Sequence, residues 1–181
     1  MNCSRTKVST LERVDLYQDR FVNTEQSIIR GTPEKKDAYT MAVFACIFHS
    51  DGKMLIQRRQ KSKKSWPGMW DVSVGGAVTS GETSLTAVQR EIAEELGIQV
   101  KEENLTKLLA LYYDRMIHDF YSVEMDLTLS DLKLQEEEVM DAKWASCEEI
   151  NQMIADGSFI PVYGEFIDLL FRMKTKRGIL A

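Results

Sequence analysis

One segment, residues 83–96, constrains more than any other how this chain folds. Its apolar residues recur at the spacing that places side chains on one face of an α-helix. They are Leu85, Val88, Ile92 and Leu96. Gly97 follows them, and glycine readily adopts the left-handed conformation that ends a helix. The sequence therefore predicts an amphipathic helix whose apolar face must be covered by another layer of the protein.

The segments around this helix have the composition of β-strands. Strands are predicted at residues 41–49, 54–59, 69–76, 105–113, 120–129 and 139–145. Asp51-Gly52 between the first two is typical of a hairpin turn. His118-Asp119 is expected near the link between two later strands. Residues 14–31 predict a further hairpin, within an N-terminal extension of about residues 11–35.

Helices are predicted again at the end of the chain, over about residues 146–175. Ser146 and Glu149 match a capping box that opens one helix, and residues 162–173 carry the apolar pattern of another. Strands interrupted by one helix and followed by further helices indicate an α/β fold, with a mixed β-sheet between helices. Residues 1–181 are expected to form a single domain, because their number is typical of one.

Composition excludes several classes of function. The 23 basic and 28 acidic residues give a net charge of −5, which disfavours binding of a nucleic acid polymer but permits a small phosphorylated substrate. Three cysteines without CxxC spacing predict neither a disulfide framework nor a zinc site. No apolar run reaches the roughly 20 residues that span a bilayer, and the N-terminus lacks a signal-peptide pattern. We expect a cytoplasmic protein without a membrane partner.

Three carboxylates in the predicted helix point to a metal ion. Glu91, Glu94 and Glu95 stand at positions i, i+3 and i+4, so their side chains share one side of the helix beside its apolar face. Like charges at this spacing repel one another, and Mg²⁺ is a natural compensator because it prefers oxygen ligands. A solvated acidic helix face is the alternative when these carboxylates are considered alone.

The residues on either side of the carboxylates suit such a site. Gly75-Gly76 is expected to turn tightly into the loop before the helix and to expose a carbonyl near the metal. Arg90 is expected to point away from Glu91 along the helix. An ion pair between Arg90 and Glu82 would then hold the loop against the helix.

The stretch GAVTSGETSLTAVQREIAEELGI, residues 76–98, resembles the signature of the Nudix family. Nine specified positions agree in type and spacing, which makes chance agreement remote. They are Gly76, Glu82, Arg90, Glu91, Ile92, Glu94, Glu95, Gly97 and Ile98.

The resemblance implies an α/β/α sandwich with a metal site on its central loop and helix. Glu91, Glu94, Glu95 and the Gly76 carbonyl would be the metal ligands, while Arg90 and Glu82 would orient them. The implied cofactor is Mg²⁺, with Mn²⁺ as the alternative. The implied reaction is attack of a metal-activated water on a diphosphate linkage in a nucleoside diphosphate joined to another group. A homodimer is expected by resemblance only.

The general base of that reaction is left open between three carboxylates. Glu94 and Glu95 lie within the signature, and Glu138 ends an acidic run, Glu136-Glu137-Glu138, just before a predicted strand. Similar Nudix proteins carry a functional glutamate at such a place. A solvated acidic loop is the alternative explanation for the run. The expected catalytic residues are therefore Glu94, Glu95, Arg90 and Glu138.

Residues 11–150 also look like the branch of the family related to isopentenyl-diphosphate isomerase. The segments that carry this resemblance include ERVDLYQDRF, MAVFACIFHSDGKMLIQRR and KKSWPGMWDVSVGG. The isomerase uses a cysteine just before the signature and histidine metal ligands, yet residues 70–76 contain neither. Hydrolysis is therefore favoured over an isomerase-like activity. The intact set of Glu91, Glu94 and Glu95 favours it over the second alternative, a non-catalytic ligand-binding module.

The remaining cysteine and histidines have ordinary structural explanations. Cys46 lies in an apolar strand, where a small buried thiol is expected. His49 is expected in an exposed turn and His118 in an exposed loop.

Residues before the signature are candidates for substrate binding. Either Arg58 or Arg59 is expected to face the cleft, because side chains alternate along a strand. Lys64, in the basic loop of residues 61–68, would bind a phosphate as a point charge. Trp66 would stack on a base or an apolar group. A solvated basic loop is the alternative for the lysines, and core packing is expected for Trp70.

Overall fold

The computed structural model describes residues 11–18, 22–32 and 38–174. The strands are β1 (Arg13–Gln18), β2 (Val22–Ile29), β3 (Thr40–Phe48), β4 (Met54–Arg59), β5 (Trp70–Asp71), β6 (Val74–Ala77), β7 (Thr106–Tyr113), β8 (Met116–Glu124) and β9 (Val139–Ala145). The α-helices are α1 (Ser84–Leu96), α2 (Cys147–Ala155) and α3 (Gly164–Met173), and two short 3-10 helices are η2 (Glu102–Asn104) and η3 (Leu129–Asp131).

The strand β3 lies at the centre of a seven-stranded sheet. The order is β5-β4-β3-β8-β7, with β6 also paired to β3 and β9 to β4. The pairing of β3 with β8 is parallel, whereas β4, β6 and β7 pair antiparallel with their neighbours. The predicted mixed sheet is confirmed.

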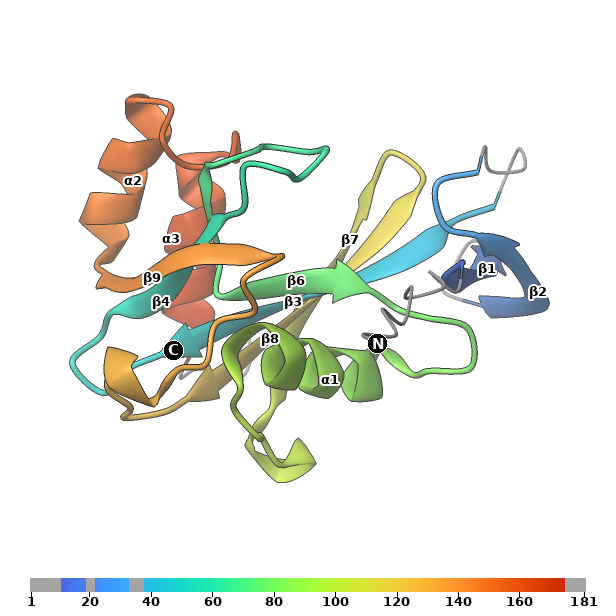
Figure 1. Cartoon of the computed structure of the whole chain (residues 1–181), viewed down its shortest axis with the longest axis horizontal. Coiled ribbons are helices and arrows are strands. Elements are labelled where there is room, and N and C mark those ends of the chain that lie inside the picture. Colours follow the sequence, from blue (N-terminus) through green and yellow to red (C-terminus); the bar gives the residue numbers. More distant parts are fainter. Residues whose placement is uncertain (1–10, 19–21, 33–37, 175–181) are drawn as a thin grey trace, which may run out of the picture.

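Helices cover both faces of this sheet (Figure 1). Alternate side chains of β3 point to opposite faces, so Ile47 packs in one apolar cluster and Cys46 in another. The apolar stripe of α1 joins the first cluster through Val88, Ile92 and Leu96. The helices α2 and α3 join the second through Ile150, Met153, Ile167 and Leu170. The α/β/α arrangement is confirmed.

The predicted C-terminal end of α1 and start of α2 are confirmed, whereas Thr83, expected inside α1, precedes it. Thr83 is the N-cap of α1 and accepts a hydrogen bond from the Thr86 backbone N–H, while Gly97 ends the helix with φ 72°. Ser146 and Glu149 form the capping box that opens α2. No helix among the described residues is long and apolar enough to cross a membrane.

The N-terminal hairpin is confirmed as an antiparallel pair of β1 and β2. Its connection, residues 19–21, lies outside the described residues, as do residues 33–37 of the segment that follows. The hairpin contacts the loop before α1, because Val14 bridges Thr79 and Asp15 accepts hydrogen bonds from Ser80 Oγ and from the Gly81 N–H. It therefore flanks the segment that leads into the carboxylate-bearing helix (Figure 1).

The expectation that His118-Asp119 lies near a link between strands is wrong. Both residues lie within β8, and the link to β7 is the turn at Asp114-Arg115, where Asp114 has φ 52°. Asp119 is 1% exposed, and Lys107 Nζ donates to its Oδ2 over 2.6 Å. The polar residues belong to a buried strand because this cross-strand ion pair compensates the charge of Asp119.

Residues 69–76 form two short strands rather than one. The break falls at the buried Ser73, whose hydroxyl donates to the Leu55 carbonyl and accepts from the Ile47 N–H. Gly75 and Gly76 lie inside β6 and are not among the glycines with positive φ, so the expected tight turn at this pair is wrong.

Candidate active site

The carboxylate of Glu91 packs directly against Gly76. Glu91 is only 8% exposed, and a Cβ added at Gly76 would overlap its carboxyl group. Glycine is needed here for this close approach between β6 and α1, and backbone freedom plays no part.

Glu95 lies one turn further along α1 and is 4% exposed. Its Oε2 accepts a hydrogen bond of 2.9 Å from Nε2 of Gln57, which is 3% exposed on β4. Gln57 was missed by sequence reasoning because a single glutamine matches no motif. The signal was a polar residue that continues the buried run of Met54, Leu55 and Ile56.

Burial raises the pKa of both carboxyl groups. The pKa of Glu95 rises to about 8, first because of burial and then because of the charge of Glu91; the hydrogen bond from Gln57 acts in the opposite direction. Burial likewise raises the pKa of Glu91, although the hydrogen bond from Arg90 opposes the effect. The raised pKa values mean that the described side chains do not fully stabilise the ionised form of these two carboxyl groups, which a cation would favour.

Arg90 connects three glutamates to the strand before the helix. Its Nε and Nη2 donate to Glu82 over 2.7 and 2.9 Å, and Nη1 donates to Glu91 over 2.8 Å and to Glu94 over 3.1 Å. Nη2 also donates to the Ala77 carbonyl over 3.0 Å. The expected pair with Glu82 is confirmed. The expectation that Arg90 points away from Glu91 is wrong, because the forked guanidinium reaches several acceptors at once.

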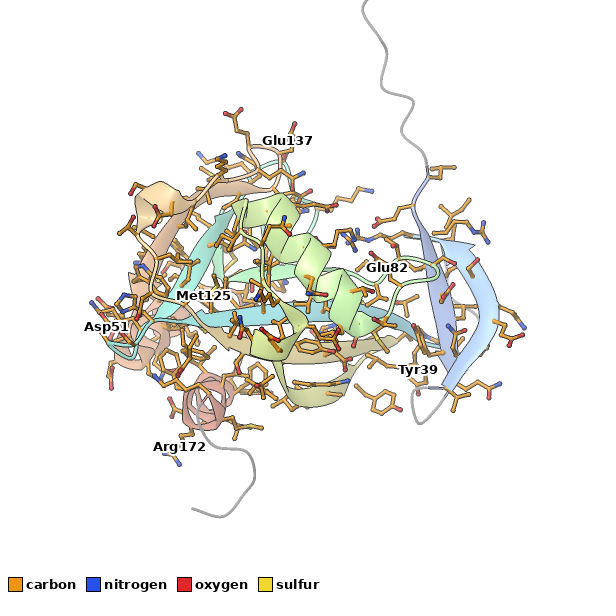
Figure 2. The ribbon with its side chains drawn as sticks, turned by 90° about the horizontal axis from the view of Figure 1, so that it is seen from below. Tyr39, Asp51, Glu82, Met125, Glu137 and Arg172 are labelled. Atoms are coloured by element: carbon orange, nitrogen blue, oxygen red, sulfur yellow. The ribbon has the colours of Figure 1, made fainter. Side chains whose placement is uncertain are left out.

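Glu82 holds the loop before α1 in place. Besides its bonds from Arg90, it accepts hydrogen bonds from the backbone N–H and the hydroxyl of Thr79. Arg90 is the main reason why the pKa of Glu82 falls to about 2. In Figure 2, Glu82 lies on the loop near the start of α1, toward the hairpin, and Glu137 lies near the opposite end of the helix.

The carboxylates do not form a closed metal cage. Among residues 11–18, 22–32 and 38–174, no group of three or more His, Cys, Asp or Glu side chains converges to hold a metal ion. Glu94 is directed to Arg90, and its side chain is 51% exposed. The donor set nevertheless fits a hard divalent cation, since Glu91 and Glu95 offer oxygen ligands whose charge is under-compensated. The close approach at Gly76 keeps Glu91 within this set.

Glu138 and Lys63 form an ion pair beside Glu95. Lys63 Nζ donates to Glu138 Oε2. The charge of Glu138 raises the pKa of Glu95, and the charge of Lys63 lowers it, so both act on the same carboxylate. The structure thus brings Glu138, the candidate base outside the signature, to the C-terminal end of the carboxylate cluster. It also adds Lys63, the only lysine of the loop with a described partner at this site, which sequence reasoning did not single out from its neighbours.

The two candidate arginines brace the loop after β4. Arg58 Nε donates to the Gly68 carbonyl over 2.9 Å. Arg59 donates to the Ser65 carbonyl over 3.1 Å and pairs with Asp71 over 3.0 Å. Asp71 is 4% exposed, and burial raises its pKa to about 6 against the opposing effect of Arg59.

Lys64 and Trp66 lie on the surface of the same loop. Lys64 is exposed and makes no hydrogen bond or ion pair within the described residues. Trp66 is 47% exposed and has φ 51°. Trp70 instead packs against the cluster under α2 and α3, with Lys143 Nζ 4.8 Å from its ring centroid.

The sheet face opposite α1 is filled by aromatic rings next to Gly75. A Cβ added at Gly75 would lie 2.9 Å from the Phe44 ring, whose centroid is 4.9 Å from that of His118. His118 is partly buried, and burial lowers its pKa, so the expectation of an exposed loop is wrong.

Cys46 and His49 both lie in or next to β3. Cys46 is fully buried, as expected, whereas Cys3 lies outside the described residues. His49 follows β3, as expected for a turn, but its side chain is only 30% exposed because it packs 5.1 Å from the Trp144 ring.

Comparison with known proteins agrees with this geometry. The sequence model described as NUDIX domain matches residues 38–169. An uncharacterized Nudix hydrolase of Listeria monocytogenes is 36% identical over 169 residues, which cover 93% of this chain and 99% of the relative. An isopentenyl-diphosphate Delta-isomerase of Salmonella arizonae is 34% identical over 139 residues, 70% of this chain and 75% of the relative. A crystal structure from Deinococcus radiodurans, 28% identical, superposes with a TM-score of 0.73 over 90% of this chain and 99% of that chain.

Proposed function

Because the chain belongs to the Nudix hydrolase family, we propose that it hydrolyses the diphosphate linkage of a nucleoside diphosphate joined to another group. Members of this family act on nucleoside diphosphate derivatives and typically require a divalent metal ion. The resemblance to the isomerase branch is also confirmed, but at lower identity than the resemblance to the hydrolase.

The observation that carries the proposal is the buried pair of Glu91 and Glu95 on α1. Both are under a tenth exposed, and Glu91 is fitted against Gly76. Burial of two neighbouring carboxylates costs stability unless a cation compensates them. A site that buries two carboxylates despite this loss of stability is suited to binding a cation.

We propose Mg²⁺, with Mn²⁺ as a substitute, as that ligand. Glu91, Glu94, Glu95 and the Gly76 carbonyl would hold it. Glu94 would exchange its contact with Arg90 for the cation, which its exposure permits. When bound, the ion would neutralise charge on the diphosphate and lower the pKa of a nearby water.

The side chains have separable tasks in this reaction. Arg90, fixed by Glu82, orients Glu91 and Glu94. A carboxylate must remove a proton from the attacking water, and Glu94, Glu95 and Glu138 are the candidates. The contact of Glu138 with Lys63 supports a role for Glu138. When the Lys63 ammonium binds a substrate phosphate instead, the Glu138 carboxylate is free to accept a proton.

Substrate contacts are proposed for the loop after β4. Arg58 and Arg59 would contribute mainly by fixing the loop, since their Nε atoms already bond to loop carbonyls. Lys64 and Trp66 are exposed and thus accessible to a phosphate and to a base, respectively. Lys63 joins them as the cation next to Glu138.

A substrate panel with and without Mg²⁺ tests the proposal. Nucleotide sugars, dinucleoside polyphosphates and nucleoside triphosphates would be incubated in ¹⁸O-water, and the products identified by mass spectrometry. We expect Mg²⁺-dependent cleavage with the label in a phosphate product. Tight binding without turnover on the whole panel would instead support the ligand-binding module. Conversion of isopentenyl diphosphate would support the isomerase.

Light scattering of the purified protein tests the proposed homodimer.

A further inference from the structure

Gln57 is a buried amide whose hydrogen bonds are incomplete. It lies on β4 with Asp71 of β5 and Ala142 of β9 as its strand partners, and it is 3% exposed. Its Nε2 donates to Glu95, but its Oε1 is buried and has no hydrogen-bond partner. A buried polar atom without a partner destabilises the folded state. The bond to Glu95 accounts for the N–H side of the amide, whereas packing of the strand leaves its Oε1 unexplained.

The orientation of the amide is fixed by its neighbour. With Nε2 toward Glu95, an N–H donor meets a carboxylate oxygen. With a cation bound, Glu95 is ionised, and the reverse orientation would place a carbonyl oxygen against a carboxylate oxygen, which is repulsive. Oε1 is therefore the atom left over. Within the described residues, Glu95 accepts this bond at Oε2 and none at Oε1.

We propose that Gln57 is a positioning residue of the divalent-cation site: its N–H orients the Glu95 carboxylate, and its Oε1 accepts a hydrogen bond from a water molecule of the hydrated cation. The inference rests on the proposed function. It explains the unpartnered oxygen, because Mg²⁺ in proteins keeps several waters that need acceptors. It also explains why the buried Glu95 carboxylate accepts a hydrogen bond from a neutral amide, since metal ligands are commonly oriented by hydrogen bonds from neighbouring groups.

The test measures Mn²⁺ binding to the purified full chain by electron paramagnetic resonance, without substrate. Gln57→Met keeps an unbranched side chain of similar length and removes both polar atoms. We expect the dissociation constant for Mn²⁺ to rise about 10- to 100-fold, the usual effect of losing a group that orients a ligand. Gln89→Met is the matched control, because Gln89 is a partly buried glutamine on α1 that donates to the Val100 carbonyl. This control is expected to bind Mn²⁺ like the wild type.

A double-mutant cycle shows whether Gln57 acts through Glu95. In a Glu95→Gln background, Gln57→Met is expected to weaken Mn²⁺ binding much less than it does in the wild type. Equal weakening in both backgrounds, or unchanged binding in Gln57→Met alone, would overturn the inference. A wild-type chain that fails to bind Mn²⁺ at all would instead refute the cation site of the proposed function.

A measurement on the wild type covers the case in which Gln57→Met does not fold. The side-chain amide of Gln57 gives its own ¹⁵N–¹H signals, which are expected to shift on titration with Mg²⁺. The corresponding signals of Gln89 are expected to stay in place. If the wild type binds Mg²⁺ while the Gln57 amide signals do not move, the inference is wrong and the cation site stands.

Discussion

The carboxylate of Glu91 occupies the space that a side chain at Gly76 would need. Glu91 belongs to α1 and Gly76 to β6, so the contact joins the helix that bears the carboxylates to the sheet beneath it. Because Glu91 is buried in this contact, its position is fixed by packing before any ligand binds.

Substitution of Gly76 by alanine tests this contact. The added methyl group must displace Glu91, and overpacking of this kind costs about 1–3 kcal/mol of unfolding free energy. Hydrolysis and Mn²⁺ affinity are both expected to fall well below wild type. Gly75→Ala is the control, since its methyl group meets Phe44 on the opposite face. It is expected to lower the melting temperature but to leave Mn²⁺ affinity close to wild type.

Glu95→Gln is expected to lower turnover by several orders of magnitude while the protein stays folded. The substitution keeps the shape of the side chain and removes the negative charge that a cation would require. Circular dichroism and steady-state kinetics at saturating Mg²⁺ provide the measurement. Glu103→Gln, at an exposed glutamate of η2, should behave as wild type. Undiminished turnover in Glu95→Gln would remove the proposed role of this carboxylate.

Glu138→Gln separates a catalytic carboxylate from a solvated acidic loop. If Glu138 is the general base, kcat is expected to fall by about 10²- to 10⁴-fold, and the acidic limb of the pH profile should change shape. Glu137→Gln is the matched control, because Glu137 is the exposed neighbour in the same run. Equal, small effects of the two substitutions would leave Glu94 and Glu95 as the candidates.

Lys63 and Lys64 are adjacent but differ in their surroundings. Lys63 pairs with Glu138, whereas Lys64 is exposed. We expect Lys63→Met to raise KM for a diphosphate substrate about tenfold or more, which corresponds to loss of about 1.4 kcal/mol of binding free energy. Lys64→Met is expected to raise KM less. The opposite order would assign the phosphate contact to Lys64.

The bond between Glu82 and Arg90 predicts a pH dependence of stability. The pKa of Glu82 is lowered to about 2 in the folded protein from an ordinary value of 4.5, so the ionised group favours the folded state. Its stabilising effect is complete above pH 4.5 and is lost as the pH falls toward 2. Wild type and Glu82→Gln should therefore differ in unfolding free energy at pH 6 and converge near pH 2. A difference that does not change with pH would exclude ionisation of Glu82 as its cause.

The local sequence pattern was sufficient to predict the structure where a single segment determines its own conformation. The apolar spacing of residues 83–96, with Gly97 after them, specifies a helix and its C-terminal end. The Asp51-Gly52 turn likewise specifies the hairpin of β3 and β4. The fixed spacing of the nine signature positions between Gly76 and Ile98 identified the family. Glu91, Glu94 and Glu95 lie together because they fall within about one turn of α1.

The same local reasoning failed where a residue's partner lies on another strand. His118 and Asp119 are polar and suggested a link, yet Lys107 on β7 compensates Asp119 inside the sheet. Gly76 suggested a turn, yet the side chain of Glu91 explains it.

The sequence by itself determined the family, the α/β class and the carboxylates of the candidate site, since these depend on residues a few positions apart. Only the tertiary structure decided which other groups join them. Gln57 and Lys63 reach Glu95 and Glu138 across 38 and 75 positions of the chain. Such contacts arise from strand pairing and helix packing, which bring distant segments together without leaving a local pattern that predicts the partner.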